Sequence, residues 1–206
     1  FADHGALLDP PTSDVTARCI GMLAQLDSDA YAEPIRRGVD FLKSEQETDG
    51  SWFGRWGTNY VYGTWSVLCA LNAVGEDMQA SYIRKSVNWL KARQGDDGGW
   101  GEDGATYWED TKGVNKASTA SQTSWAVLGL MAAEETESTN VERGIKFLLE
   151  SPRSGSTWEE PWYTAVGFPK VFYLKYHGYN VYFPLWALSR YRNLKKGNTG
   201  KVPFGM

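Results

Sequence analysis

Residues 36–52, RRGVDFLKSEQETDGSW, combine an amphipathic pattern with a glycine-containing turn that ends in tryptophan. Two later stretches align with this one: RKSVNWLKARQGDDGGW at 84–100 and ERGIKFLLESPRSGSTW at 142–158. In each copy apolar residues recur at i, i+4 and i+7, which is one face of an amphipathic helix. The shared columns hold aliphatic residues in all three copies: Ile35, Ile83 and Val141; Val39, Val87 and Ile145; Leu42, Leu90 and Leu148.

A more apolar segment precedes each of these amphipathic helices, at 14–26, 64–74 and 119–132, and a fourth follows at 181–194. The repeating unit is therefore a helical hairpin with a period of about 50 residues, which is typical of α-solenoids and closed α/α toroids. We expect an all-α fold of about seven helices, an incomplete α/α toroid of the α6–α6 barrel type. Residues 1–195 are expected to form this barrel portion, and residues 196–206 a mobile tail.

The turn that ends each amphipathic helix carries a second repeated pattern, Gln-x-x-x-Gly-x-Trp, near 46–52 and 94–100 and in degenerate form near 152–158. We expect the glutamine amides to satisfy carbonyls at the helix end, the glycines to adopt left-handed backbone, and the tryptophans to cover the turn. In the third copy Pro152 replaces glutamine and Ser156 replaces glycine. We interpret these residues as structural staples and not as catalytic groups: Gln46, Gly50, Trp52, Gln94, Gly98, Trp100 and Trp158.

Composition excludes several classes of function. The net charge of −4 argues against a nucleic-acid binder, which needs a basic face. The two histidines are too few for a His-rich metal site, and no apolar run reaches the length of about 18 residues that a membrane span requires. The chain opens without the features of a signal peptide. Cys19 and Cys69 lie in helix-like apolar segments, so we expect two buried free thiols and no disulfide.

Aromatic residues are unusually frequent, with 10 Trp, 11 Tyr and 8 Phe. Many lie in GRWGTNYVYG at 54–63 and GFPKVFYLKYHGY at 167–179. Together with the repeats and DPPTSDVTAR at 9–18, these segments resemble the squalene-hopene cyclases, a family of class II triterpene cyclases, up to about residue 194. The resemblance implies the C-terminal part of a catalytic α/α barrel in an enzyme that cyclises squalene to hopene and hopanol. Such an isomerase and lyase needs no metal and no organic cofactor.

The chemistry of this family explains why aromatic residues would be frequent in such a chain. Ring faces stabilise carbocations, by about 2 kcal/mol when the pair is desolvated, and they exclude water that would end the reaction early. Residue patterns alone favour ordinary core packing for these rings, whereas the resemblance implies a cavity wall. The spacing of the second aromatic segment predicts one helical face with Pro169 in its first turn. The implied cavity residues are Trp56, Tyr62, Phe168, Phe172, Leu174, Tyr176 and Tyr179.

Asp14 and Arg18 lie four residues apart at an expected helix start. From the residues alone we interpret them as a helix-start aspartate in a solvated salt bridge. The resemblance instead implies that they belong to the hydrogen-bond network around the catalytic acid, although the family often has histidine at the position of Arg18. Phe1 and Ala2 correspond to a constriction of the substrate channel, where His4 replaces an expected phenylalanine.

The family protonates its substrate with an Asp-x-Asp-Asp motif, which this sequence does not contain. The resemblance therefore implies two partners, squalene and an N-terminal portion of the same enzyme, and an isolated chain that is soluble but inactive. It also implies a parent enzyme bound peripherally, as a monotopic protein, to the bacterial cytoplasmic membrane, and a possible homodimer. The alternative is a non-catalytic α/α repeat domain that binds apolar ligands or partners. A prenyltransferase-like β subunit is a weaker alternative, because it requires zinc ligands.

Overall fold

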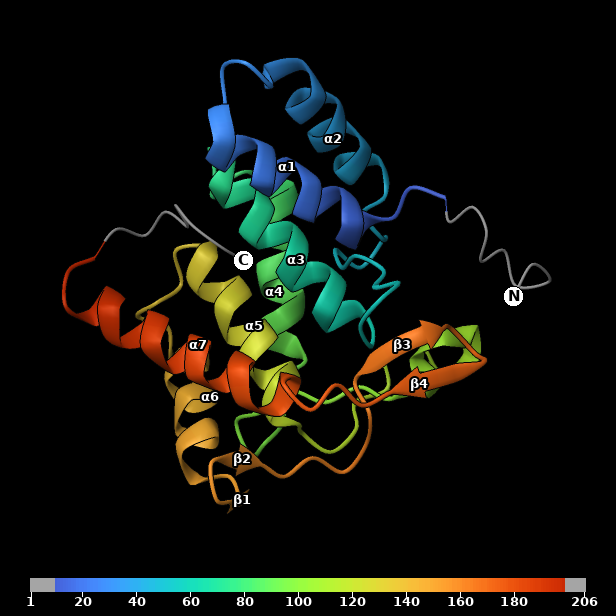
Figure 1. Ribbon diagram of the computed structural model, residues 1–206, viewed down its shortest axis with the longest axis vertical. Coiled ribbons are helices and arrows are strands. Elements are labelled where there is room, and N and C mark those ends of the chain that lie inside the picture. Colours follow the sequence, from blue (N-terminus) through green and yellow to red (C-terminus); the bar gives the residue numbers. More distant parts are fainter. Residues whose placement is uncertain (1–9, 199–206) are drawn as a thin grey trace.

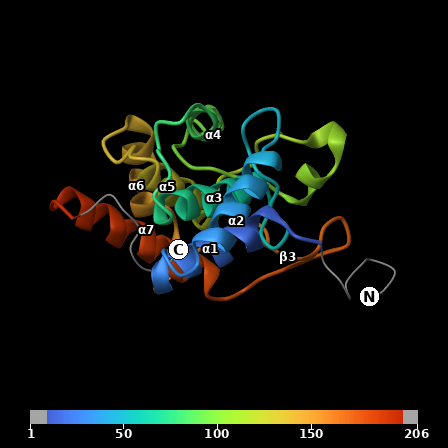
Figure 2. The same ribbon diagram turned by 90° about the horizontal axis from the view of Figure 1, so that it is seen from above.

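The computed structural model describes residues 10–198, and its helices form two layers (Figure 1). The inner layer contains α1 (Ser13–Asp27), α3 (Tyr60–Ala73), α5 (Ala120–Ala132) and α7 (Tyr179–Lys195). The outer layer contains α2 (Ala32–Ser44), α4 (Ser81–Ala92) and α6 (Thr139–Glu150). Each inner helix packs against the next inner helix, and each of the first three also contacts the outer helix that follows it. Seen from above, α4 and α6 lie on one side of α3 and α5 (Figure 2).

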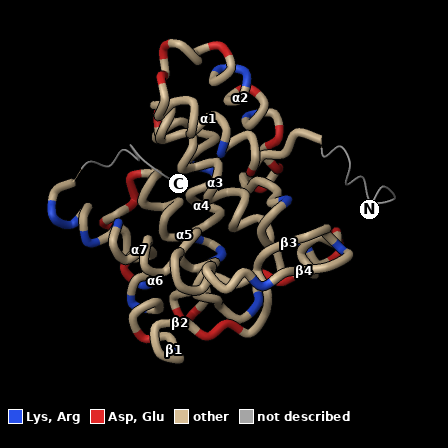
Figure 3. Tube along the Cα trace, viewed as in Figure 1, with Lys and Arg blue, Asp and Glu red and all other residues tan. Residues whose placement is uncertain are grey.

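The predicted alternation of apolar and amphipathic helices is confirmed. The aliphatic columns of the three amphipathic helices face the core, where Leu42, Leu90 and Leu148 are fully buried. Helices α3 and α5 contain no charged residue, and the charges gather on the outer helices, on α7 and in the loops (Figure 3). Almost every residue of α3 and α5 is buried, which explains why these two helices read as apolar all round.

Short antiparallel hairpins interrupt the helical fold at two places, where the sequence predicted no strand. Strand β1 (Arg153–Ser154) pairs with β2 (Thr157–Trp158), and β3 (Ala165–Phe168) pairs with β4 (Phe172–Leu174). Two 3₁₀ turns, Gly104–Tyr107 and Glu109–Thr111, lie in the loop before α5. Within residues 10–198 no helix combines the length and apolarity that crossing a bilayer would require.

The tryptophans of the three turns make the same hydrogen bond. The indole N–H groups of Trp52, Trp100 and Trp158 donate to carbonyl oxygens ten residues earlier, at distances of 2.7, 2.8 and 2.8 Å. The acceptors are the carbonyls of the buried leucines near the end of each outer helix: Leu42, Leu90 and Leu148. At most 2% of each tryptophan is exposed, so each ring both covers its turn and satisfies a helix-end carbonyl.

The glutamines act differently from our expectation, because they reach the next outer helix and not the end of their own. The Gln46 amide donates to the Gly50 carbonyl within its turn (3.0 Å) and to the Tyr82 carbonyl in α4 (2.9 Å). The Gln94 amide closes its own turn in the same way and donates to the Asn140 carbonyl in α6 (2.9 Å). The turn of one hairpin therefore attaches to the following hairpin.

The glycines of the two intact turns adopt left-handed backbone, as predicted, with φ of +100° at Gly50 and +88° at Gly98. Both also approach the next outer helix closely. A Cβ at Gly50 would lie 3.0 Å from the carbonyl oxygen of Lys85, and a Cβ at Gly98 would lie 2.8 Å from that of Arg143. Both positions therefore need glycine for conformation and for space.

Apolar side chains are exposed on α1 and α7, the first and last inner helices of the described chain. Met22 and Leu26 are 51% and 65% exposed on α1, and Tyr182 and Leu185 are 72% and 49% exposed on α7. Within residues 10–198 each of these helices has an inner neighbour on one side alone. Cys19, which we expected to be buried, is exposed on α1 for the same reason; Cys69 is buried, and neither forms a disulfide.

Replacing Trp52 with phenylalanine tests the turn. We expect Trp52→Phe to lower the free energy of unfolding by about 3 kcal/mol, because the buried Leu42 carbonyl loses its donor and a cavity forms. Urea unfolding followed by circular dichroism measures the change. The matched control is Trp108→Phe, since Trp108 is 52% exposed; its effect should stay within about 0.5 kcal/mol. Equal effects at the two positions would contradict the role of the indole bond.

The exposed apolar faces of α1 and α7 should make the isolated chain self-associate, because association removes their apolar surface from water. Sedimentation velocity over a range of concentrations should show species larger than the monomer. Met22→Glu combined with Tyr182→Glu should return the chain to monomer, whereas Leu149→Glu on outer helix α6 should not. A monodisperse wild-type monomer at all concentrations would show that the two faces are not adhesive.

Candidate functional site

The loop at residues 53–59, between the first turn and α3, carries Trp56 and is held at its start by Asp14. One carboxylate oxygen of Asp14 accepts the backbone N–H groups of Arg55 and Trp56, both at 2.9 Å. The other accepts the Val15 N–H (3.0 Å) and the Thr12 hydroxyl (2.5 Å). Asp14 is only 1% exposed. The interpretation as a solvated helix-start pair is therefore wrong: these four donors replace water around a buried carboxylate.

Glu102 holds the other end of this loop. Its carboxylate accepts the backbone N–H groups of Asn59 (3.1 Å) and Val61 (2.8 Å) in the first turn of α3, and only 4% of the residue is exposed. Burial raises the pKa of Glu102, and the two N–H donors oppose that rise. Sequence reasoning missed this residue. The available signal was an acidic residue two positions after the tryptophan of an intact turn, since a helix N-terminus favours an anion.

Arg55 joins the loop to the β3–β4 hairpin and was also missed. Its guanidinium carbon lies 4.3 Å from the ring centroid of Trp56 and 5.3 Å from that of Phe168. It donates to the Gly167 carbonyl at 2.9 Å, and the residue is 8% exposed. A guanidinium this close to two ring centroids interacts with both rings and so links the loop to the hairpin. A cation beside tryptophan in the short stretch GRWG was the signal that could have identified it.

The helix predicted across Phe168, Phe172, Tyr176 and Tyr179 is wrong, because Phe168 ends β3 and Phe172 begins β4. Pro169 and Lys170 form the turn between the strands, with Lys170 at φ +69° and the Val171 N–H donating to the Phe168 carbonyl (3.0 Å). Proline followed by a residue with positive φ is the signature of a type II turn. The turn pairs Phe168 with Phe172, and their ring centroids lie 5.3 Å apart.

A second group of rings surrounds Trp125 in α5. Tyr62, 8% exposed near the start of α3, lies 4.9 Å from the Trp125 ring, and Tyr179 at the start of α7 lies 5.8 Å from it. Tyr176, in the loop before α7, lies 5.1 Å from Tyr179. Burial raises the pKa of Tyr62, which keeps its phenol neutral. Leu174 ends β4 and is partly buried.

The loop that carries Trp56 contacts the second group of rings at the start of α3. A Cβ at Gly57 would lie 2.4 Å from the Tyr62 ring, so this loop glycine and Tyr62 are in close contact. Arg18 lies above the neighbouring Trp65 ring at 4.5 Å, and its charge opposes the rise in the Tyr62 pKa. Trp56 is 41% exposed, so its ring retains an open face. Phe1 and Ala2, implied at a channel constriction, and His4 lie outside the described residues.

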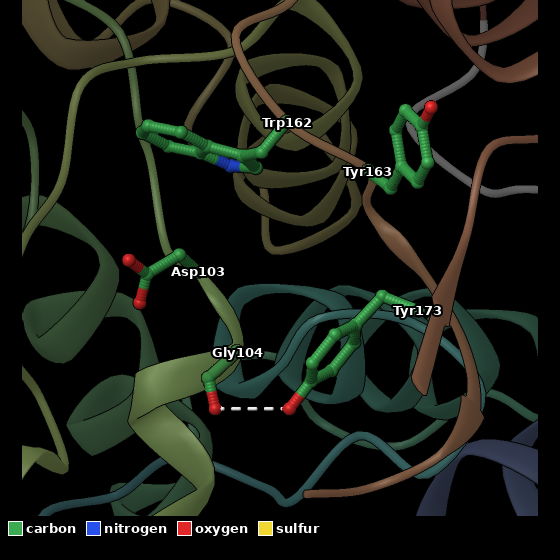
Figure 4. Close-up of a pocket in the computed structure, with 5 residues that line it drawn as sticks. All are labelled: Asp103, Gly104, Trp162, Tyr163 and Tyr173. Atoms are coloured by element: carbon green, nitrogen blue, oxygen red, sulfur yellow. Dashed lines mark hydrogen bonds between the residues drawn. The ribbon is translucent and has the colours of Figure 1, made fainter. Parts of the chain in front are cut away.

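A hollow of about 310 Å³ lies beside the β3–β4 hairpin (Figure 4). It is bounded by Asp103, Gly104, Trp162, Tyr163 and Tyr173. Tyr173 and Asp103 make hydrogen bonds within the fold, whereas the buried indole N–H of Trp162 has no hydrogen-bond partner among the described residues. The Tyr173 hydroxyl donates to the Gly104 carbonyl (3.1 Å), and Asp103 accepts the Ala105 N–H (2.9 Å) and pairs with Lys116 (3.4 Å). No group of histidine, cysteine and acidic residues within 10–198 could hold a metal ion.

Comparison with known proteins identifies the family. The profile of the squalene-hopene cyclase C-terminal domain matches residues 1–193. The chain belongs to this family. A probable squalene–hopene cyclase of Sinorhizobium fredii is 57% identical over 96% of the chain, and the squalene–hopene cyclase of Alicyclobacillus acidocaldarius is 52% identical over 93%. The chain spans 31% and 30% of the lengths of these two relatives.

A solved structure supports the fold of this cyclase C-terminal domain. The ent-copalyl diphosphate synthase of Streptomyces platensis superposes with a TM-score of 0.58 over 90% of the chain and 33% of the synthase. The sequences are 20% identical, so the likeness concerns the fold alone. The expected α/α architecture and the expected family are both confirmed.

Because the pKa of Glu102 is raised, the free energy of unfolding of this cyclase domain should depend on pH, and Glu102→Gln should remove the part of that dependence that Glu102 causes. Because the folded-state pKa exceeds the unfolded one, the stability that Glu102 contributes is complete at low pH and is lost as pH rises through the folded pKa. Relative to the glutamine variant, the wild type should therefore lose stability with rising pH. Urea unfolding between about pH 4 and pH 8 measures this difference. Parallel pH profiles would show that Glu102 is not responsible.

Proposed function

We propose that this chain forms the C-terminal part of an enzyme that cyclises squalene to hopene and hopanol. An aspartic acid in the N-terminal portion starts the reaction by protonating an alkene, and this chain supplies part of the cavity wall around the resulting carbocation. The membership of the family and the names of the relatives support this proposal. The observation that carries it is the grouping of Trp56 and Phe168 around Arg55, with Phe172 in ring contact with Phe168.

In this proposal the rings stabilise cationic intermediates through their π faces, and they exclude water until the final ring has closed. Trp56, Phe168 and Phe172 would face the cation, while Tyr176, Tyr179 and Leu174 would shape the cavity. Tyr62 would present a neutral phenol to the cavity, since burial raises a pKa that ordinarily already lies well above neutral pH. Late addition of water to the last cation gives the alcohol, and loss of a proton gives the alkene.

Asp14 and Arg18 would act as positioning residues. Asp14 binds the backbone N–H of Trp56 and thereby fixes where that ring stands. Arg18 lies over the Trp65 ring and acts electrostatically on the Tyr62 phenol, and its permanent charge would bias the network around the missing acid. The family resemblance alone supports the remaining parts of the proposal: no cofactor, a monotopic association with the bacterial cytoplasmic membrane, and a homodimeric parent enzyme.

The test combines this chain with the N-terminal portion of the Sinorhizobium fredii relative and supplies squalene in detergent micelles. Hopene and hopanol, detected by gas chromatography and mass spectrometry, should form only when both parts are present. Phe168→Ala should lower the rate by about 30-fold, because a cation–π contact of about 2 kcal/mol is lost. Trp108→Phe, an exposed ring outside the proposed wall, should leave the rate unchanged.

Two outcomes would contradict the proposal. Product from the chain alone would show that the initiating acid lies within these residues. No product from the associated parts would favour the alternative, an α/α repeat domain that binds apolar ligands without catalysis.

A further inference from the structure

The main chain of the loop that carries Trp56 is held on two sides. Asp14 accepts the backbone N–H of Trp56 at 2.9 Å, and the Trp56 carbonyl accepts the N–H of Val166 in β3 at 3.2 Å. Next to this contact, Gly57 and Ala165 form an antiparallel β-bridge. These contacts fix where the Trp56 side chain begins, but none of them involves its ring.

The Trp56 ring therefore needs a contact of its own to fix its orientation. The residue is 41% exposed, and within residues 10–198 no second aromatic ring stacks against it. A partly exposed indole on a fixed main chain has several staggered rotamers open to it. The Arg55 guanidinium lies 4.3 Å from the centroid of this ring. Contact between a cation and an indole face at a partly desolvated site favours the contacting rotamer by about tenfold.

Arg55 is itself attached to the β3–β4 hairpin. Its guanidinium donates to the Gly167 carbonyl at 2.9 Å and lies 5.3 Å from the Phe168 ring centroid, and the residue is 8% exposed. A guanidinium donates hydrogen bonds in its plane and contacts rings with its faces, so it can make both kinds of contact at once. The side chain thus relates the Trp56 ring to the ring of Phe168, which in turn contacts Phe172.

The positive charge of Arg55 cannot itself stabilise a carbocation, because like charges repel. Any favourable contribution to a cationic reaction must therefore come through the groups that Arg55 orients. The Trp56 face in contact with the guanidinium is occupied, so a substrate cation would use the opposite face of that ring.

We propose that Arg55 is a positioning residue that determines how far the proposed cyclisation proceeds. It holds the Trp56 ring in the orientation in which this ring and Phe168 together stabilise the carbocation. The inference rests on the proposed function for this chemistry, whereas the effect of Arg55 on the Trp56 ring is measurable without substrate.

A Trp56 ring that leaves this orientation would let the reaction end early. The unstabilised cation either forms a C–O bond with water, which then loses a proton to solvent, or loses a proton from the adjacent carbon to form a C=C bond. Either step gives a product with fewer rings than hopene. A misplacement of about 1 Å is enough to slow a positioned step by about 100-fold, so early termination competes with the next ring closure. Arg55 would therefore control the ratio of the products.

The orientation of Trp56 is measured by ¹⁹F NMR on the chain labelled with 5-fluorotryptophan. Trp56→Phe identifies the Trp56 signal among those of the ten tryptophans. In Arg55→Met this signal should move toward that of free 5-fluorotryptophan and become narrower, because the ring loses its contact and gains mobility. Circular dichroism checks that the variants fold. An unchanged Trp56 signal would overturn the inference.

Arg153→Met is the matched control, because Arg153 makes the same pair of contacts at the third turn. Its guanidinium lies 4.8 Å from the Trp158 ring centroid and donates to the Leu149 carbonyl at 2.8 Å. This variant should change the Trp158 signal and leave both the Trp56 signal and the product ratio as in the wild type.

The products of the two combined parts test the consequence for the reaction. Arg55→Met should raise the share of products with fewer rings than hopene by about tenfold relative to the wild type. Loss of stability cannot cause this change, since the ratio of products does not depend on the folded fraction. Arg55→Lys keeps the charge but not the planar donor group, so it should restore the ratio only in part.

The outcomes separate this inference from the cyclase proposal. Absence of product from the wild-type parts would contradict the cyclase proposal itself. Product from the wild type with an unchanged ratio in Arg55→Met would overturn the role of Arg55 alone. Full restoration by Arg55→Lys would also overturn it, because charge and not ring contact would then be responsible.

Discussion

The hydrogen bond from each turn tryptophan to the leucine carbonyl ten residues earlier is the interaction on which the architecture depends. It removes an unsatisfied carbonyl from the end of each outer helix and buries a large ring at the point where the chain reverses. With the ring in place, the tryptophan backbone N–H faces a threonine of the next inner helix, as Trp52 faces Thr64. One side chain therefore ends a helix, directs the chain inward and anchors the following hairpin.

The positions of Trp56, Phe168 and Phe172 follow from this arrangement. The loop that carries Trp56 begins directly after the Trp52 turn, and buried carboxylates hold it at both ends: Asp14 from α1 and Glu102 from the loop after α4. Arg55 then ties the loop to the β3–β4 hairpin. Elements from separate repeats thus converge on a few rings, and the rings are aligned only when the repeats are stacked.

Local periodicity was sufficient to predict the helices, because an amphipathic repeat reports directly on which face is buried. The site was harder, because a spacing of four residues brings side chains together both on a helix and across a tight hairpin turn. Phe168 and Phe172 were therefore expected in contact for the wrong reason; Pro169 marked the turn. Asp14 could not be placed from sequence, since its partners are backbone N–H groups 41 and 42 positions away.

The link from each turn to the following hairpin gives the repeat a direction, and this direction matters while the chain is being synthesised. The Gln46 amide meets its Ser86 acceptor 40 residues later. At ribosomal rates of about 5–20 residues per second, that acceptor is made about 2–8 s after the glutamine. During this interval the Gln46 amide can donate to the Gly50 carbonyl of its own turn but lacks its partners in α4. Each new hairpin therefore completes the one made before it, and the barrel portion should assemble in the order of translation.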